Sequence, residues 1–76
     1  MQRQYTVLVR YDPEDGAYNV EVPALPGCVT FGDTLPEALA MAADAIAGYL
    51  DVLRQEGKPI PVEGQPVQAI VLTVAA

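Results

Sequence analysis

Hydrophobic and polar residues alternate at the start of the chain. Over residues 4–11, one side of the alternation is apolar or aromatic and consists of Tyr5, Val7, Val9 and Tyr11. A period of two is typical of a strand with one buried face. The sequence therefore predicts a first strand over residues 4–11.

Two turns divide the next part of the chain. Residues 12–16, Asp-Pro-Glu-Asp-Gly, supply a proline for the first turn position and a glycine for positive φ. Alternation resumes over residues 17–22, which predicts a β-hairpin. Residues 23–27, Pro-Ala-Leu-Pro-Gly, cannot extend a ladder because proline lacks an N–H. They are expected to form a rigid turn before a short third strand at 28–31.

The pattern then changes to that of a helix. Thr34 and Glu37 have the spacing of a capping box, and Pro36 falls in the first turn, where no N–H partner is needed. The helix is expected to end at residue 55 or 56, with Gly57 as its left-handed stop. Its apolar face is broad because two stripes lie side by side. The first stripe contains Leu39, Ala43, Ile46, Leu50 and Leu53, and the second contains Ala38, Ala42, Ala45, Tyr49 and Val52.

A last strand is expected after a proline-rich connector. Residues 59–66 form this connector, and residues 67–74 alternate again. The element order is then βββαβ, an α+β fold in a single domain over residues 1–76. A right-handed crossover would return the last strand parallel to the first. The prediction is a four-stranded mixed sheet of order 3-2-1-4, with one long helix on one face.

Charge and hydropathy limit the classes of partner. Ten acidic residues against four basic ones give a net charge of −6. This opposes the counterion release that supplies most nucleic-acid affinity, so no direct DNA or RNA binding is expected. No apolar run approaches the roughly 20 residues of a membrane helix. No membrane contact is therefore expected. Residues 1–5 lack the cationic start and apolar stretch of a secretory signal, so the chain is expected to be cytoplasmic.

The residues needed for common catalytic sites are missing. The chain has no His and no Ser, and Cys28 is its single cysteine. This excludes a Ser or Cys triad within the chain, an intrachain disulfide and the soft ligand sets of zinc or iron. Asp12, Glu14 and Asp15 form a local acidic cluster, which is best interpreted as a solvated turn. No catalytic residue, no metal ligand and no cofactor are predicted, and the chain is not expected to be an enzyme.

The second helical stripe has two possible roles. One helix cannot press so wide a face onto a four-stranded sheet, so Ala38, Ala42, Ala45, Tyr49 and Val52 are candidates for an oligomer interface. Loops that wrap over the stripe would account for it equally well. The two interpretations remain open at the level of sequence.

A longer motif spans residues 22–38. It combines the Pro-Gly corner, a short strand, the Gly-Asp-Thr entry to the helix and Glu37-Ala38 at fixed spacing. Together with the acidic turn, the Tyr-x-Val-x-Val-Pro strand ending at Pro23 and the exit at residues 57–61, it resembles the HicB-like antitoxin family. The resemblance covers nearly the whole chain.

The resemblance implies a partial ribonuclease H-like fold and a protein partner. That partner would be a small basic HicA-like toxin, an mRNA interferase whose RNA cleavage is inhibited by occlusion. Full-length members often carry a C-terminal DNA-binding element, which a short form such as this one is expected to lack. The expected contact residues are Asp12, Glu14, Asp15, Glu21, Pro23, Pro26, Gly27 and Phe31, with the acidic turn steering a basic partner toward the Pro-Gly corner.

Two other functions are compatible with the sequence. The chain could be a stand-alone homo-oligomeric scaffold or regulator, a dimer or tetramer with no toxin partner. It could also be a metal-dependent nuclease. The nuclease is disfavoured because residues 4–11 contain no carboxylate, which the first strand of ribonuclease H-like enzymes needs.

Overall fold

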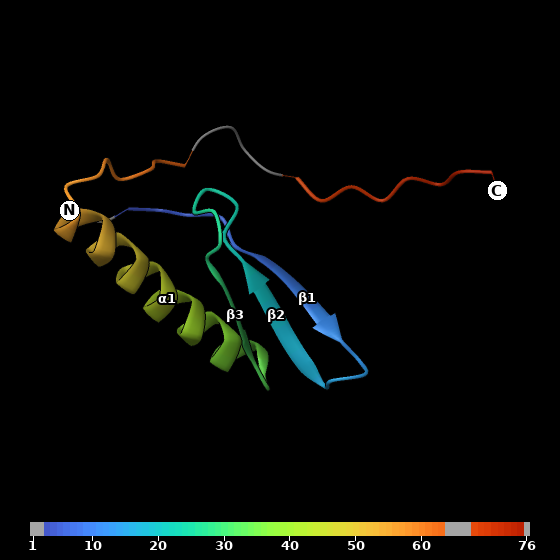
Figure 1. Cartoon of the computed structure of the whole chain (residues 1–76). Coiled ribbons are helices and arrows are strands. Elements are labelled where there is room, and N and C mark those ends of the chain that lie inside the picture. The colour runs from blue at the N-terminus through green and yellow to red at the C-terminus, as the bar shows by residue number, and fades with distance from the viewer. Residues whose placement is uncertain (1–2, 64–67, 76) are drawn as a thin grey trace.

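Three strands and one helix make up the regular structure of the described residues. The computed structural model describes residues 3–63 and 68–75. Its elements are β1 (Leu8–Asp12), β2 (Ala17–Glu21), β3 (Val29–Gly32) and α1 (Leu35–Gln55) (Figure 1). The strands form an antiparallel sheet of order β1-β2-β3, and α1 packs on one face. The predicted order 3-2-1 is confirmed, and so is a single long helix on one face.

The register divides the sheet residues into two faces. Leu8 pairs with Glu21, and Glu21 pairs with Val29. In the same way Val9, Val20 and Thr30 form a row across the three strands. Because successive residues of a strand point to opposite faces, these two rows lie on opposite sides of the sheet. Val20 is 2% exposed and packs with the helix, so its row faces α1.

Small residues bring α1 close to the sheet. A Cβ atom built on Gly32 would lie 2.5 Å from the backbone nitrogen of Ala38. Ala38 and Ala42 are buried and pack against Val20 in one cluster of the core. The helix contacts β2 and β3 but has no contacts with β1. The helix side of β1 is therefore left without a cover.

The corner between β2 and β3 holds the second part of the core. Its backbone is closed by hydrogen bonds from the Leu25 N–H to the Val22 carbonyl and from the Cys28 N–H to the Leu25 carbonyl, both 3.0 Å. Leu25 is fully buried and packs with Val22, Cys28 and Leu50 of α1. The predicted rigid turn is thus also a core element.

The predicted ends of the helix are confirmed. Thr34 is the N-cap, and its hydroxyl accepts a hydrogen bond of 3.2 Å from the Glu37 N–H. This satisfies one of the N–H groups that have no partner within the helix. At the other end Gly57 has φ of +68°, the left-handed conformation expected of a helix stop.

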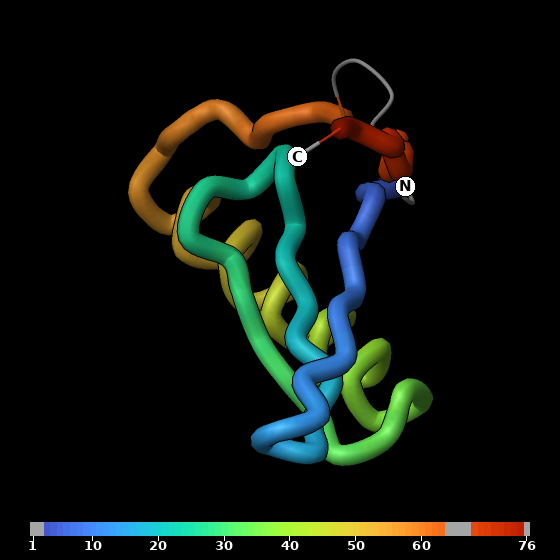
Figure 2. The backbone as a smooth tube through the Cα atoms, turned by 90° about the vertical axis from the view of Figure 1, so that its right-hand side faces the viewer, coloured from blue at the N-terminus to red at the C-terminus, as the bar shows by residue number. Residues whose placement is uncertain are grey.

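The C-terminal segment differs from the prediction. Residues 68–75 form no strand, and the described sheet ends at β1. The predicted fourth strand, whose first residue lies outside the described residues, and its place beside the first strand are therefore not confirmed. We call residues 68–75 the arm. The arm projects from the body of the chain beyond the sheet, and none of the described strands pairs with it (Figures 1 and 2). The ribonuclease H-like relationship stays a prediction.

The second helical stripe is mostly used within the chain. Ala38 and Ala42 are buried in the chain's own core, which corrects their prediction as oligomer contacts. Ala45 and Tyr49 are partly buried against the cluster around Leu25. These side chains are covered because α1 turns this stripe toward β2 and β3. Val52 alone among the five is exposed.

Candidate functional site

The face of the sheet opposite α1 carries the strongest candidate for an interaction surface. Two rows cross the three strands on this side, and we call their six residues the open face. The open face consists of Leu8, Glu21 and Val29 in one row and Arg10, Asn19 and Phe31 in the next. In Figure 2 the sheet lies in front of α1, so no described helix covers these residues.

Large apolar side chains of the open face are exposed to solvent. Val29 is 65% exposed and Phe31 is 62% exposed. A shallow groove of about 510 Å³ is lined by Leu8, Arg10, Val29 and other residues of β1 and β2, and Ala69 of the arm borders it. Exposed apolar clusters with polar neighbours mark protein interaction sites. The open face therefore has the composition of a docking surface.

The acidic turn is a structured element with two free carboxylates. The Asp12 carboxylate accepts hydrogen bonds from the Glu14 N–H at 2.9 Å and from the Asp15 N–H at 3.4 Å, while the Gly16 N–H bonds the Asp12 carbonyl. A side chain used in this way stabilises the turn. Glu14 and Asp15 are exposed. In the described structure the Asp12 carboxylate is used by the turn, while Glu14 and Asp15 present theirs to solvent.

The structure separates the acidic turn from the Pro-Gly corner. The turn precedes β2 and the corner follows it, so they lie at opposite ends of this strand (Figures 1 and 2). A strand of five residues spans about 17 Å at 3.3–3.4 Å per residue. The prediction that the turn steers a partner toward a neighbouring corner is therefore wrong in its geometry.

The predicted contact residues fall into three groups. Asp12, Glu14 and Asp15 belong to the turn, and Pro23, Pro26 and Gly27 belong to the corner. Glu21 and Phe31 lie on the open face between these ends. The prolines and Gly27 are exposed, but the corner's backbone is tied to α1, because the Tyr49 hydroxyl donates a 2.9 Å hydrogen bond to the Pro26 carbonyl.

Sequence reasoning missed four residues of the open face. Leu8, Arg10, Asn19 and Val29 were assigned only to strands. The signal that could have found them is the hairpin register, since a closed turn at residues 12–16 places Arg10 opposite Asn19. The same counting places both residues on the side away from Val20.

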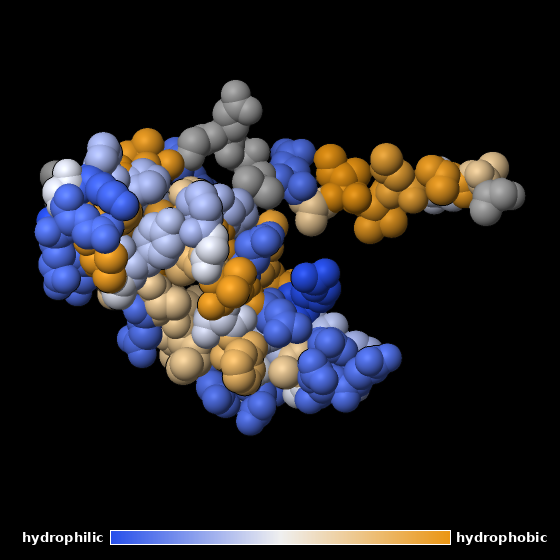
Figure 3. All heavy atoms as spheres, in the orientation of Figure 1, coloured by the Kyte–Doolittle hydropathy of each residue, from blue (hydrophilic) through white to orange (hydrophobic). Residues whose placement is uncertain are grey.

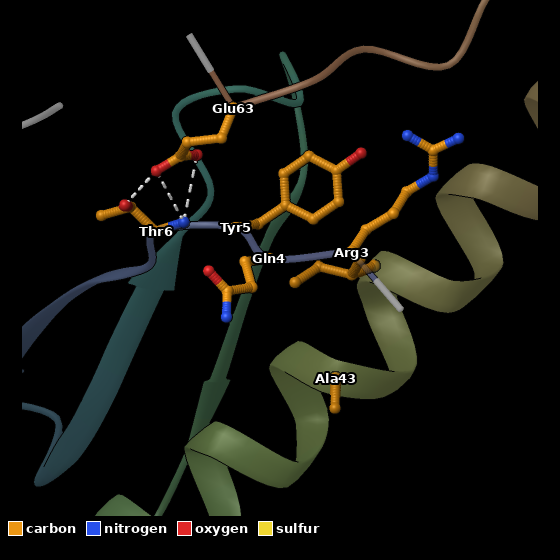
Figure 4. Close-up of a pocket in the computed structure, with 7 residues that line it drawn as sticks. Arg3, Gln4, Tyr5, Thr6, Ala43 and Glu63 are labelled. Atoms are coloured by element: carbon orange, nitrogen blue, oxygen red, sulfur yellow. Dashed lines mark hydrogen bonds between the residues drawn. The ribbon is translucent and has the colours of Figure 1, made fainter. Parts of the chain in front are cut away.

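A second structured contact links the connector after α1 to the start of the chain. Both carboxylate oxygens of Glu63 accept from the Thr6 N–H at 3.1 Å, and the Thr6 hydroxyl donates to the same carboxylate (Figure 4). The Tyr5 hydroxyl donates to the Pro61 carbonyl, and Ile60 packs on the core. These contacts hold the chain beside the segment that leads into β1, a few residues before the arm begins.

We expect the contact between Glu63 and Thr6 to be lost in acid. The hydrogen bonds from Thr6 lower the pKa of Glu63 from its ordinary value of 4.5. A lowered pKa contributes stability above the ordinary value and loses it as the pH falls through the folded value. The free energy of unfolding of the native chain should therefore fall toward that of a Glu63→Gln variant below pH 4.5.

This pH dependence is measured by urea denaturation of both proteins between neutral pH and acid. The Thr6 amide resonance should move over the same range in NMR spectra. A constant difference between the two proteins at all pH values would contradict the role given to the Glu63 carboxylate.

The single cysteine has the environment of a packed residue. Cys28 is 6% exposed, and burial raises the pKa of its thiol. A raised pKa keeps the thiol neutral, which makes it a poor nucleophile. Among residues 3–63 and 68–75, no group of three acidic or cysteine side chains is arranged to hold a metal ion. Within the same residues, the helix is not apolar enough over its length to cross a membrane.

The family of the chain follows from its sequence and fold together. A family model described as the HicB-like antitoxin of bacterial toxin-antitoxin systems matches residues 5–74. The chain belongs to this family. The match includes the open face, the corner and most of the arm, so the features described above lie within the family's domain.

Individual relatives agree with this assignment. A UPF0150 protein of Thermoplasma acidophilum is 48% identical over 58 residues, which are 76% of this chain and 83% of the relative. Antitoxin HicB 1 of Photorhabdus laumondii is 39% identical over 51 residues, 67% of this chain and 33% of that antitoxin. The HicB-like chain thus spans about a third of the length of that antitoxin.

A solved structure has the same fold. The crystal structure of the N-terminal domain of the Burkholderia pseudomallei antitoxin HicB superposes with a TM-score of 0.70 at 27% identity. The match covers 79% of this chain and 69% of that domain. Membership of the HicB-like family supports an antitoxin role in a toxin-antitoxin system.

Proposed function

We propose that this HicB-like chain inhibits a small basic HicA-like mRNA interferase by binding it through the open face. The observation that carries the proposal is the pair Val29 and Phe31, both more than half exposed on a sheet face that no described element covers. Large exposed side chains of this kind can act as binding hot spots when a partner buries them. Bound there, the chain would deny the toxin access to RNA by occlusion.

Charge supports the choice of a basic partner. The chain carries a net charge of −6, and Glu21 lies on the open face itself. Glu14 and Asp15 extend the acidic surface to one end of the sheet. Complementary charge speeds association and excludes acidic partners more than it adds affinity. Val29 and Phe31 would supply most of the binding energy, and the carboxylates would mainly increase the rate of association.

The direct test is co-expression of the chain with a HicA-like toxin. We expect growth to recover and a complex of the two proteins to be purified. Phe31→Ala should weaken this complex at least about thirtyfold, because truncating a hot-spot residue costs about 2 kcal/mol or more. Isothermal titration calorimetry measures the change.

Tyr11→Ala is the matched control for Phe31→Ala. Tyr11 is also an exposed aromatic residue, 52% exposed, but it belongs to the row that faces the helix side of the sheet. We expect less than a threefold effect on toxin binding. Equal effects of the two substitutions would show that the open face is not the toxin interface. If the native chain forms no complex with the toxin, inhibition of that toxin is excluded.

A second function is favoured by the arm. A stand-alone homo-oligomeric scaffold or regulator needs a surface that joins copies of the chain, and the exposed apolar arm supplies one. The two functions differ in the co-expression test, because a scaffold without a toxin partner gives no growth rescue.

A further inference from the structure

The arm has the composition of a buried strand. Ile70, Val71, Leu72 and Val74 are 70%, 95%, 78% and 77% exposed. Figure 3 shows the arm as a largely apolar extension that stands apart from the rest of the surface. Apolar residues in both rows of an alternating segment are typical of strands covered on both faces. The hydrophobic effect therefore strongly favours a state in which the arm is covered.

The outer edge of β1 is the part of the sheet that could pair with the arm. Within the described residues β1 pairs with β2 alone, so its outer N–H and C=O groups are free to pair with another strand. Above this edge, on the helix side, Val9 is 40% exposed and Tyr11 is 52% exposed, since α1 does not reach β1. Leu39 of α1 is 43% exposed as well. An added strand would cover apolar side chains that the chain itself leaves in solvent.

The arm does not lie along its own β1. Contacts of Tyr5 and Thr6 with Pro61 and Glu63 hold the preceding connector at the start of the strand. Ala69 borders the groove with Leu8, and the following residues then leave the body (Figures 1 and 2). All described arm residues are exposed. The arm is thus extended and presented outward, in the form in which a second molecule could receive it.

We propose that the arm adds as a fourth strand to the β1 edge of a second copy of this chain, and that the arm of the second copy adds to the β1 edge of the first. A reciprocal exchange gives a closed, two-fold symmetric dimer. Each β1 edge is then paired, and apolar side chains of each arm lie beside Val9 and Tyr11 on the helix side of the sheet. The open face stays accessible and becomes wider by one strand.

The first test measures the native mass of the purified chain by light scattering. We expect twice the mass of a single chain, which is 8.1 kDa. A Val71→Pro/Leu72→Pro variant should be a monomer. The N–H groups of adjacent residues in a strand point to opposite edges of the strand, so one of the two prolines must remove a hydrogen bond to β1. Both side chains are exposed in the single chain, so these substitutions leave its fold intact. Val71→Ile is the matched control and should remain a dimer.

The second test distinguishes exchange from pairing within one chain. A variant with Arg10→Cys in β1 and Thr73→Cys in the arm is treated with a short flexible bis-maleimide. Exchange gives a crosslinked product of dimer size on a denaturing gel. The native chain, whose Cys28 is buried, serves as the control and should give no product.

Each other outcome would overturn the proposal. A monomeric native chain excludes the exchange, and a dimer that tolerates the double proline is built on another surface. A crosslinked product of monomer size would place the arm on its own β1, and the absence of any product would place it on neither edge. No toxin is present in either test, so the result is independent of the proposed inhibition.

Discussion

Replacing Leu25 with alanine is expected to lower the free energy of unfolding by about 3 kcal/mol, within the range of about 2–5 kcal/mol for such truncations. Leu25 has no exposed surface and packs against Val22, Cys28 and Leu50. The corner is closed by backbone hydrogen bonds on both sides of Leu25, so its neighbours cannot easily collapse into the cavity. When the neighbours do not collapse into the cavity, the lost contacts are not replaced and the loss of stability is large.

Urea denaturation followed by circular dichroism measures this loss at a fixed protein concentration. Val62→Ala is the control, since Val62 is 69% exposed and its truncation should change the free energy by less than about 0.5 kcal/mol. The dependence of the free energy on urea should be the same in both variants. A loss below about 1 kcal/mol in Leu25→Ala would show that the corner is not part of the core.

Leu25 illustrates why sequence alone gives only part of this fold. Alternation and the Thr34 cap are local signals, so the helix and the second and third strands are predicted nearly at their observed positions. The first strand was expected from residue 4 but begins only at Leu8. Leu25 stands between two prolines, where a local interpretation finds only a turn. Its burial depends on Leu50, which lies 25 residues further along the chain and reaches it only through the packing of α1.

The two helical stripes show a similar limit. Their periodicity predicts a broad apolar face but does not say which half meets the sheet. The choice depends on Gly32 in β3, where the missing side chain lets Ala38 approach. The helix therefore turns Ala38 and Ala42 inward and leaves Leu39 exposed. A contact of this kind joins two elements and leaves no periodic pattern in either.

The candidate site was predictable in part for the same reason. Phe31 was an expected contact from its place in the family motif and Glu21 from its negative charge, and the structure places both on the open face. Their neighbours on β1 become visible only when the register is known. The arm is the opposite case, because its alternation predicts a strand that the structure does not confirm, and the described chain provides no neighbouring strand for it. Pairing of such a segment depends on a neighbour that the local pattern does not specify.

Replacing Gly32 with alanine is expected to destabilise the chain by about 3 kcal/mol, the upper part of the usual range for overpacking. The new Cβ atom would lie 2.5 Å from the Ala38 nitrogen and 2.7 Å from the Ala38 Cα. Both are backbone atoms of α1, so no side-chain rotation relieves the overlap. The helix would have to move away from β3 and lose its contact with Val20.

Gly48→Ala is the matched control for Gly32→Ala and should have the opposite sign. No atom lies within 4 Å of a Cβ built at Gly48, which is inside α1. Alanine there should stabilise the helix by about 0.5–1 kcal/mol. Thermal and urea denaturation measure both changes. Neither Gly32 nor Gly48 has positive φ, so backbone strain does not distinguish the two variants. The difference in their stabilities therefore reports the space available for a Cβ atom at each position. Equal effects would mean that α1 does not depend on Gly32 for its close approach to the sheet.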